Sequence, residues 1–247
     1  MKRVLLVGAT DGIGRALALH YAETGWHVGV VGRDKVKVEA VAKIVASRSP
    51  HPAVGVVAGV TDPESVRRAF AEALNALGQL DLVIYCAGTM AAEQTPEDRA
   101  HAAASAFDVN AKGAVYWLEH AADYFATVGF GRLAAIGSVA GVRGRKGHPV
   151  YSASKAALHT YLEGMRHRLH GSGVGVSTVL PGWVRTRMLP AAAAGSRLAV
   201  DPQRAAALIA AGLERGRETF FVPGPWALGA FVIRCMPRWL FKRIAPP

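Results

Sequence analysis

A tyrosine and a lysine stand four residues apart in this 247-residue chain, at Tyr151 and Lys155. On a helix, residues at positions i and i+4 lie on the same face, so the phenol and the ammonium would be neighbours. A phenol has an ordinary pKa of about 10, which is too high for ready proton exchange at neutral pH. A neighbouring ammonium stabilises the phenolate and lowers that pKa. The pair therefore predicts a group that could donate or accept a proton in catalysis.

Two polar residues upstream could complete such a site. Ser138 ends an apolar run, where its hydroxyl could hold a substrate carbonyl oxygen in place for protonation. Asn110 stands inside a long stretch with a helical pattern, and asparagine is a poor helix former, so its position favours a functional role. Taken singly, each of these four residues would more often have a packing or surface role. The argument for a site depends on their combination.

A glycine-rich turn, Gly8-Ala9-Thr10-Asp11-Gly12-Ile13-Gly14, follows the first apolar run and precedes a helical pattern. Glycines permit a tight turn, let the backbone approach a pyrophosphate and let the helix pack on the strand. The first turn of the helix then offers free N–H groups and a partial positive charge to the phosphates. The turn predicts a dinucleotide site, although a turn of this composition can also occur without a ligand.

The end of the second expected strand bears on which dinucleotide is bound. A fold that prefers NAD places an acid there, about 20 residues beyond the glycines, to hold the ribose 2′-hydroxyl. Here Arg33 occupies that place, and a guanidinium can clamp a 2′-phosphate. Asp34 precedes a helix start, so an N-cap is its simpler role. We expect NADP(H), with NAD(H) as the alternative; Arg33 could also be an ordinary solvated side chain.

Short apolar runs alternate with helical patterns along most of the chain, which predicts βαβ units. Such runs are typical of parallel strands covered on both faces. The fold class is therefore α/β, a doubly wound, Rossmann-like, seven-stranded parallel sheet with helices on both faces. The expected strands are Arg3–Val7, His27–Val31, Ala53–Ala58, Leu82–Tyr85, Arg132–Ile136, Val174–Leu180 and Thr219–Val222. The expected helices are Gly14–Glu23, Lys35–Ser47, Pro63–Ala76, one long helix near Asp98–Thr127, and Val150–His170.

Length and composition exclude several classes of protein. With 51% hydrophobic and 19% charged residues, the chain is not disordered, and it divides into one domain over 1–224 and a tail over 225–247. Two distant cysteines suit neither a disulfide framework nor a cysteine zinc site, so we expect no metal and a reducing compartment. No apolar run reaches the roughly 18 residues of a membrane span, which favours a cytoplasmic protein. The net charge of +11 is scattered and lacks aromatic-interleaved basic motifs, so no nucleic-acid partner is expected.

Taken together, these motifs resemble the short-chain dehydrogenase/reductase family in its compact single-domain form, over roughly residues 2 to 222. Cys86-Ala87-Gly88 after the fourth strand and Pro181-Gly182-Trp183-Val184 with Thr186 after the sixth add to the resemblance. It implies a catalytic tetrad of Asn110, Ser138, Tyr151 and Lys155. Tyr151 would exchange the proton, Lys155 would lower its pKa and hold the nicotinamide ribose, Ser138 would orient the substrate oxygen, and Asn110 would hold a water.

The resemblance also implies the cofactor and substrate contacts. Gly59-Val60 stands where the family often has an acid that touches adenine, so adenine would rely on backbone and apolar contact. The substrate would meet Ser138, Tyr151 and Trp183, and the protein would be a homodimer or homotetramer. The implied cofactor contacts are Gly8, Thr10, Asp11, Gly12, Ile13, Gly14, Arg33, Val60, Ala87, Gly88, Asn110, Tyr151, Lys155, Pro181, Gly182, Val184 and Thr186.

The expected pocket walls are small and apolar, at Met90–Thr95, Val139–Val142 and Trp183–Leu198. They favour a hydrophobic ketone or alcohol, while Arg185 and Arg187 could instead meet a carboxylate or phosphate. The leading hypothesis is an NADP(H)-dependent oxidoreductase that interconverts a carbonyl and an alcohol. A catalytically silent dinucleotide sensor or interaction protein is the alternative, but it would have no reason to keep the Tyr–Lys spacing with a serine upstream. Nucleotide-sugar epimerases also use a Tyr–Lys pair, but usually with a larger C-terminal substrate domain.

The tail is rich in large apolar and basic residues and contains no acid. Arg234, Arg238 and Lys242 are spaced i, i+4 and i+8, so on one helix they would form a basic stripe, which Pro237 should kink or split. A basic stripe beside Trp, Phe and Leu is typical of a helix at a membrane interface. Peripheral contact with anionic membranes is one interpretation. An arm packed over the pocket or a neighbouring subunit is the other.

Overall fold

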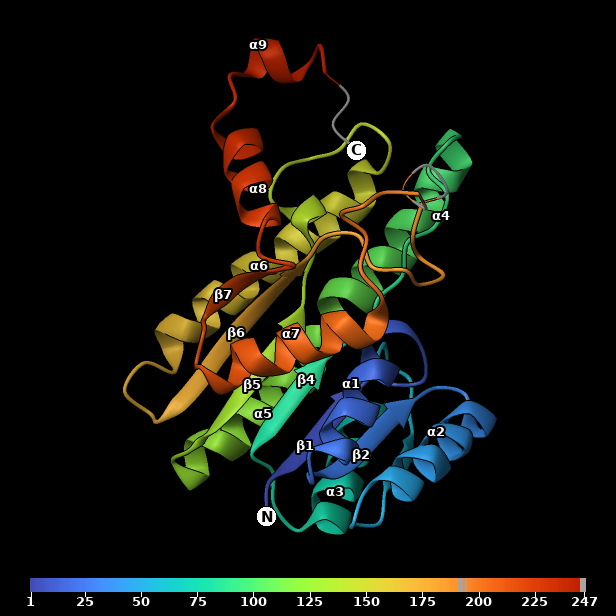
Figure 1. The fold of residues 1–247 in the computed structure, drawn as a ribbon, viewed down its shortest axis with the longest axis vertical. Helices are drawn as coiled ribbons and strands as arrows, with labels where there is room; N and C mark the ends of the chain where they lie inside the picture. The colour runs from blue at the N-terminus through green and yellow to red at the C-terminus, as the bar shows by residue number, and fades with distance from the viewer. Residues whose placement is uncertain (191–192, 194, 245–247) are drawn as a thin grey trace.

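Seven parallel strands form one sheet in the computed structural model, which describes residues 1–190, 193 and 195–244. Their order is β3-β2-β1-β4-β5-β6-β7, so the chain starts mid-sheet and winds outward in both directions (Figure 1). The expected doubly wound, seven-stranded sheet is confirmed. The strands are β1 Arg3–Val7, β2 His27–Gly32, β3 Val54–Val57, β4 Leu82–Tyr85, β5 Gly131–Ile136, β6 Val174–Pro181 and β7 Thr219–Val222.

Helices cover both faces of the sheet, and each face has its own apolar core. The central strands β1 and β4 are buried on both sides, which explains their unbroken apolar sequence. One face carries α1 Gly12–Glu23, α2 Lys35–Arg48 and α7 Pro202–Glu214. The other carries α3 Pro63–Leu77, α5 Gly113–Val128 and α6 Pro149–Arg168, with α4 Pro96–Phe107 beside α6.

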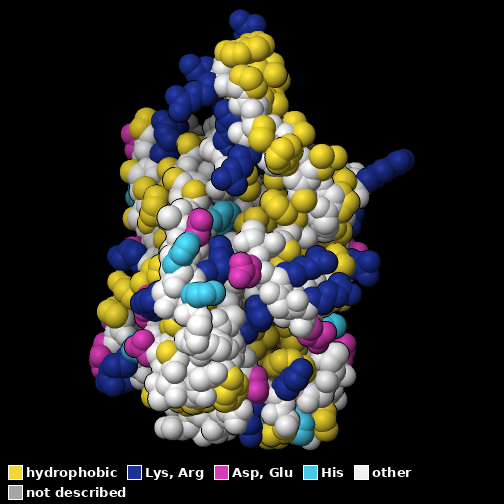
Figure 2. Space-filling model, turned by 90° about the vertical axis from the view of Figure 1, so that its left-hand side faces the viewer, with side chains coloured by type: hydrophobic (Ala, Val, Ile, Leu, Met, Phe, Trp, Pro, Cys, Tyr) yellow, Lys and Arg dark blue, Asp and Glu magenta, His cyan; other side chains and the backbone are white. Residues whose placement is uncertain are grey.

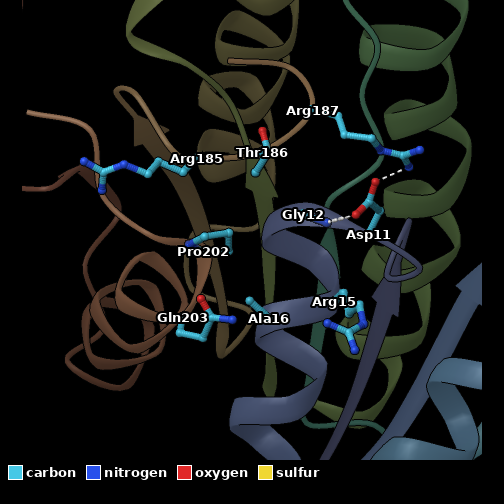
Figure 3. Close-up of a pocket in the computed structure, with 9 residues that line it drawn as sticks. All are labelled: Asp11, Gly12, Arg15, Ala16, Arg185, Thr186, Arg187, Pro202 and Gln203. Carbon is cyan, nitrogen blue, oxygen red and sulfur yellow. Dashed lines mark hydrogen bonds and ion pairs between the residues drawn. The ribbon is translucent and has the colours of Figure 1, made fainter. Parts of the chain in front are cut away.

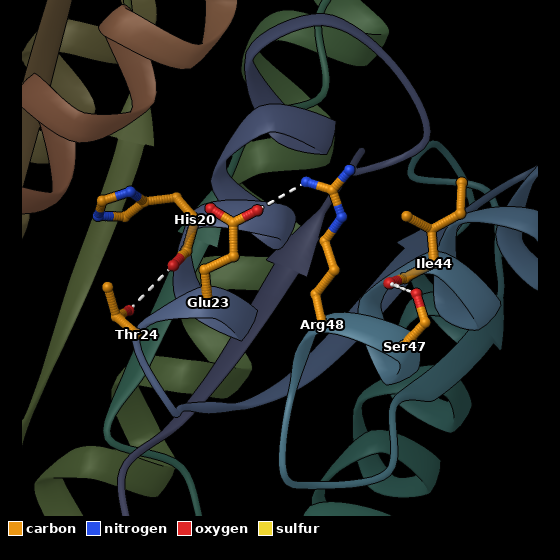
Figure 4. Close-up of polar contacts among 6 residues, drawn as sticks. All are labelled: His20, Glu23, Thr24, Ile44, Ser47 and Arg48. Carbon is orange, nitrogen blue, oxygen red and sulfur yellow. Dashed lines mark hydrogen bonds and ion pairs between the residues drawn. The ribbon is translucent and has the colours of Figure 1, made fainter.

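The far ends of α1 and α2 meet at the surface through an ion pair between Glu23 and Arg48, at 2.6 Å (Figure 4). Thr24 closes α1 by donating its hydroxyl proton to the carbonyl of His20, at 3.0 Å. Because both charged side chains are about half exposed, this ion pair adds little to the free energy of unfolding. The packing of α1 and α2 therefore depends on their shared apolar core.

The expectation of one long helix near Asp98–Thr127 is confirmed in extent, since the chain is helical without a break from residue 96 to 128, but the helix is not regular throughout. The helix is divided into α4 and α5 by a π-helical turn, η1, at Asp108–Lys112, which contains Asn110. The phenol of Tyr85 donates to the carbonyl of Val109, at 2.6 Å, and so holds the main chain of this turn against β4. Asn110 and the main chain of Val109 therefore lie close to the carboxyl end of β4. Turns of π-helix inside helices occur frequently at functional sites.

Helix α7 was not among the helices expected from the sequence. It connects β6 to β7, two parallel strands that lie side by side, and such a pair requires a crossover connection. Asp201 and Pro202 stand at its N-cap and first position. An Asp-Pro pair followed by alanine, leucine and isoleucine at helical spacing indicates the start of a helix, so the sequence did contain a signal for α7.

The tail forms two short helices, α8 Trp226–Cys235 and α9 Arg238–Phe241, so the expected split at Pro237 is confirmed. Because the helix breaks, the basic side chains of Arg234 and Arg238 lie on different helices, and the continuous basic stripe expected from their spacing does not form. In Figure 1 the two helices extend beyond the rest of the fold, past the carboxyl ends of the strands. Within the part of the chain that the structure describes, no helix has the length and apolar character needed to span a membrane.

Candidate active site

A cleft of about 990 Å³ lies at the carboxyl ends of the parallel strands. Loops that follow different strands converge there, which is the general location of ligand sites in open parallel sheets. Asn110, fully buried, is the one residue of the expected site outside the cleft lining. The expected residues that line it are Gly8, Thr10, Asp11, Gly12, Ile13, Gly14, Arg33, Val60, Ala87, Gly88, Ser138, Tyr151, Lys155, Pro181, Gly182, Trp183, Val184 and Thr186.

The glycine-rich turn packs too closely on its surroundings to carry side chains. Gly8 has φ +82°, and a Cβ there would lie 2.5 Å from the main-chain nitrogen of Ala87. A Cβ on Gly14 would lie 2.3 Å from the carbonyl oxygen of Gly8. The turn thus keeps its backbone accessible at the start of α1, where free amides favour an anion. These features fit the pyrophosphate of a dinucleotide.

Two cations flank the cleft at the end of β2. Arg33 is exposed and lines the cleft, and Lys37, in the first turn of α2, lines it as well. Asp34 caps α2 by accepting from the amide of Lys37, at 3.1 Å, which confirms its expected N-cap role. The sequence analysis did not identify Lys37, although its place in the first turn of the expected helix Lys35–Ser47, four residues after Arg33, was a usable signal.

Ser138, Tyr151 and Lys155 lie together at the inner end of the cleft. Lys155 is 3% exposed and donates to the carbonyl of Ile136, at 2.8 Å, and burial lowers its pKa to about 8. Burial raises the pKa of Tyr151, while a hydrogen bond with Ser138 acts in the opposite direction. The sequence predicted a lowered phenol pKa from the lysine spacing alone. The structure differs because burial of the phenol outweighs the stabilisation of its phenolate.

Asn110 joins three segments behind the cleft. Its Oδ1 accepts from the amide of Thr89, at 2.8 Å, and its Nδ2 donates to the carbonyl of Thr89 and to Oγ of Ser154, both at 2.9 Å. Ser154 in turn donates to the carbonyl of Tyr151, at 2.9 Å. The π-turn, the loop after β4 and helix α6 are thus tied together beside the phenol.

His159 is a second polar residue that the sequence reading missed. Its Nε2 accepts from the amide of Ser138, at 3.3 Å, and a Cβ on Gly137 would lie 2.4 Å from the same nitrogen. Burial and then the charges of Lys155 and Arg166 lower the pKa of His159 to about 4, so the ring is neutral near pH 7 and can accept. Its spacing of i+4 from Lys155 placed it on the same helix face, which was the available signal.

Two tryptophans form one wall of the cleft. Trp183 follows β6, and Trp226 begins α8, yet their rings meet edge to face with centroids 5.1 Å apart. A Cβ on Gly182 would lie 2.1 Å from the Trp226 ring, so this ring fits only against glycine. The tail therefore contributes a residue to the cleft, which the sequence did not reveal.

A smaller hollow of about 430 Å³ lies on the other side of the start of α1 (Figure 3). Arg187 points across the glycine-rich turn and pairs with Asp11. Arg185 points the other way and pairs with Asp201, at 3.3 Å. Both arginines thus have protein partners. The expected pocket wall at Trp183–Leu198 falls partly outside the described residues, because 191, 192 and 194 are not among them.

Comparisons with known proteins agree with this arrangement. The sequence model of the short chain dehydrogenase family matches residues 2–196. An uncharacterized oxidoreductase of Staphylococcus aureus (strain N315) is 34% identical over 202 residues, covering 82% of this chain and 86% of the relative. The structure of a short chain dehydrogenase/reductase from Burkholderia phymatum in complex with NAD has a TM-score of 0.86 at 21% identity, covering 100% of this chain and 96% of that one. A short-chain dehydrogenase from Sphingobium yanoikuyae in complex with NADPH has a TM-score of 0.82 at 23% identity, covering 96% and 97%.

The two solved structures support the fold, whereas the family match and the relative carry the assignment. The matched residues include the glycine-rich turn, Ser138, Tyr151 and Lys155. The Burkholderia structure is a complex with NAD, and the Sphingobium structure is a complex with NADPH. The chain therefore belongs to the short chain dehydrogenase family and is a dehydrogenase/reductase enzyme.

Proposed function

We propose that this enzyme interconverts a carbonyl and an alcohol on a hydrophobic substrate, with NADP(H) as the cofactor and Tyr151 as the acid/base. The observation that carries the proposal is the meeting of Ser138, Tyr151 and Lys155 in the same cleft as the glycine-rich turn. That arrangement puts a proton donor and a dinucleotide site side by side, which is what a hydride transfer to a carbonyl requires.

Each of these residues has a separate task. The nicotinamide, when bound, exchanges a hydride with the carbonyl carbon. Ser138 holds the substrate oxygen, and in the reduction Tyr151 gives its phenol proton to that oxygen and is left as phenolate. Lys155, whose pKa of about 8 keeps it mostly charged at pH 7, stabilises that phenolate. In the oxidation Tyr151 takes the proton back from the alcohol.

Arg33 and Lys37 support NADP(H) over NAD(H). They place two positive charges at the end of β2, on the rim of the cleft. Asp34, the carboxylate that follows Arg33, accepts from the amide of Lys37 and forms an ion pair with the Lys37 ammonium, at 3.7 Å. A 2′-phosphate would pair with these cations, and a bare ribose hydroxyl would gain less from them.

The lining at the inner end of the cleft supports an apolar substrate. Large apolar side chains from four separate segments line the cleft that also contains Tyr151, and the charged arginines that follow β6 have protein partners. A hydrophobic ketone, aldehyde or alcohol would bury apolar area there, which is favourable by about 25 cal/mol per Å². The apolar side chains are Met90, Val139, Trp183, Met188, Leu189 and Trp226.

The tail supports peripheral contact with an anionic membrane. Its large apolar side chains are exposed, at 71% for Leu228, 65% for Phe231 and 63% for Trp239. Figure 2 shows hydrophobic and basic side chains gathered at the end of the molecule where Figure 1 places α8 and α9. Arg143, from the loop after Ser138, holds this arm: it donates to the carbonyls of Ile233 and Met236, at 2.6 and 2.7 Å.

Among the described residues of the tail, Trp226 alone lines the cleft. The tail carries basic residues and no acid, so two tails would repel each other while anionic lipid headgroups would attract them. We therefore place the enzyme in the cytoplasm, as a homodimer or homotetramer that attaches reversibly to membranes. An apolar substrate would then be reached from the lipid.

A turnover screen tests the proposed function. Purified enzyme is assayed with NADPH and with NADH against apolar ketones and aldehydes, and with the oxidised cofactors against the matching alcohols. Tyr151→Phe removes the proton and keeps the ring, so turnover should fall by about 10²- to 10⁴-fold while NADPH binding, followed by fluorescence, stays close to wild type. A variant that keeps most of its activity would contradict the role of Tyr151.

A further inference from the structure

Glu93 is a buried carboxylate in the loop between β4 and α4, and the proposed mechanism does not use it. It is 7% exposed, and its two carboxylate oxygens accept from the amides of Val150, at 2.8 Å, and Tyr151, at 3.0 Å. Glu93 therefore contacts the main chain of the residue that carries the phenol, from 58 positions away in the sequence.

The start of α6 explains why a carboxylate is needed there. The helix begins with Pro149, which has no amide proton, and the side chain of His148 makes no capping hydrogen bond. Val150 and Tyr151 are then the first amides without a partner inside the helix, while the amide of Ser152 already donates to the carbonyl of His148, at 3.0 Å. Glu93 satisfies both free amides and places a negative charge at the positive end of the helix.

The loop after β4 is also connected to the carbonyl group of Tyr151, through Ser154 and Asn110. The carbonyl of Tyr151 accepts from Ser154, which is bonded to Asn110, and Asn110 is bonded at both ends of its amide group to Thr89. Arg99 in turn donates to the carbonyl of Glu93, at 3.2 Å. The amide and the carbonyl of Tyr151 are thus both anchored to the loop after β4.

We propose that Glu93 is a positioning residue for Tyr151: its carboxylate fixes the main chain of the first turn of α6 and so the place of the phenol relative to Ser138. The catalytic consequence rests on the proposed function. A displacement of about 1 Å in a reacting group can cost up to about a hundredfold in rate. Glutamine is nearly isosteric, but its one carbonyl oxygen cannot replace two acceptors, and its NH₂ group would face an amide donor.

The test compares Glu93→Gln with Glu97→Gln, which removes an exposed carboxylate in the first turn of α4. Native-state hydrogen exchange of the Val150 and Tyr151 amides reports the anchoring without any substrate. We expect exchange at least about tenfold faster in Glu93→Gln and unchanged in Glu97→Gln. Exchange within threefold of wild type would show that the carboxylate does not hold the helix start and would overturn the proposal.

The second measurement is kcat with a carbonyl substrate from the screen, at a temperature well below the unfolding midpoint of each variant. We expect kcat to fall about tenfold or more in Glu93→Gln and to stay at wild type in Glu97→Gln. Faster exchange with kcat reduced less than threefold would show that Glu93 only caps the helix, and it would overturn the positioning role.

If Glu93→Gln does not fold, Glu93→Asp, which keeps the charge at shorter reach, is judged by the same two criteria. If wild-type enzyme turns over no carbonyl substrate, the proposed function fails, and the exchange measurement still decides whether Glu93 holds Tyr151.

Discussion

Burial governs the ionisable groups at the inner end of the cleft. It raises the pKa of Tyr151 and lowers those of Lys155 and His159 to about 8 and about 4. In each case burial penalises the charged form and is the largest cause of the shift. The phenol is therefore protonated at neutral pH, which suits its proposed role as the proton donor in the reduction.

The side chain of Arg33 is expected to decide the choice of cofactor. Arg33→Ala should weaken NADPH binding by about ten- to a hundredfold, because a charge-assisted pair with the 2′-phosphate is worth about 1.5–3 kcal/mol. NADH, which lacks that phosphate, should lose much less. Dissociation constants measured by fluorescence titration check this, with Lys35→Ala, a neighbouring exposed lysine, as the control. Equal losses for both cofactors, or a wild type that prefers NADH, would contradict the assignment.

His159 should make the enzyme less stable as the pH falls. Its pKa in the folded protein, about 4, is below its unfolded value of about 6.5, so the unfolded state binds the proton first. Stability from this group is complete above about pH 6.5 and is lost as the pH falls toward 4, by up to about 2 kcal/mol between pH 7 and 5. His159→Gln keeps an acceptor for the Ser138 amide but does not titrate. Urea unfolding at both pH values should therefore show a smaller loss in this variant; an equal loss in both proteins would refute the prediction.

At the scale of the elements, the π-turn is the feature that joins the active site to the fold. It carries Asn110, which bonds the loop after β4 and helix α6 at once. Val109 beside it is held by Tyr85 of β4. A regular helix through Asp108–Lys112 would present these groups at different angles, because the π-turn widens the spiral by one residue.

Removing the side-chain amide of Asn110 should weaken the contacts among the π-turn, the loop after β4 and helix α6, and so lower the free energy of unfolding. Asn110→Ala leaves a cavity at a fully buried position and removes the partners of the part-buried amide and carbonyl of Thr89, so we expect about 2–4 kcal/mol less stability and a large loss of activity. Urea unfolding measures the change. Asn75→Ala, at an exposed position on α3, should cost less than about 0.5 kcal/mol. A cost below about 1 kcal/mol for Asn110→Ala would show that the three segments hold together without it.

At the scale of the whole molecule, the C-terminal tail contributes to the wall of the cleft. Trp226 lines the cleft, and Arg143, in the loop after Ser138, stacks on Phe241 with its guanidinium 3.9 Å from the ring centroid. The exposed apolar residues and cations of the tail therefore lie on an arm attached to the walls of the cleft. Contact of this arm with lipid would bring the cleft close to the membrane surface.

The membrane proposal predicts co-sedimentation with liposomes. Full-length enzyme should pellet with anionic phosphatidylglycerol vesicles at low salt, remain soluble with neutral phosphatidylcholine vesicles, and be released by high salt. Arg234→Glu with Arg238→Glu should abolish pelleting, as should truncation after Gly224. The matched control, Arg68→Glu with Arg215→Glu, changes the net charge equally at exposed sites away from the tail. Enzyme that stays in the supernatant with anionic vesicles would exclude the membrane role and leave assembly with a second copy, which size-exclusion chromatography would detect.

Local sequence patterns were sufficient to predict the sheet, the glycine-rich turn and the Tyr–Lys pair of the cleft. Short apolar runs identified all seven strands, because a strand buried on both faces must be apolar along its length. The glycine-rich turn was readable for a similar reason, since only glycine tolerates the approach of Gly8 to Ala87. Tyr151 and Lys155 were readable as a pair because helix periodicity alone puts them on one face. Asp34 as an N-cap and the break at Pro237 follow from equally local rules.

Contacts between distant segments required the tertiary structure. The π-turn depends on Tyr85, and the anchoring of Tyr151 depends on Glu93; neither partner is near in sequence to the residue it holds. The pKa directions also depended on the fold, because burial is a property of packing and not of spacing. The sequence by itself thus determined which residues could carry the chemistry and which elements present them. Only the packed chain decided how those residues are held, which charges are buried beside them and where the tail reaches, because these depend on contacts that no local pattern encodes.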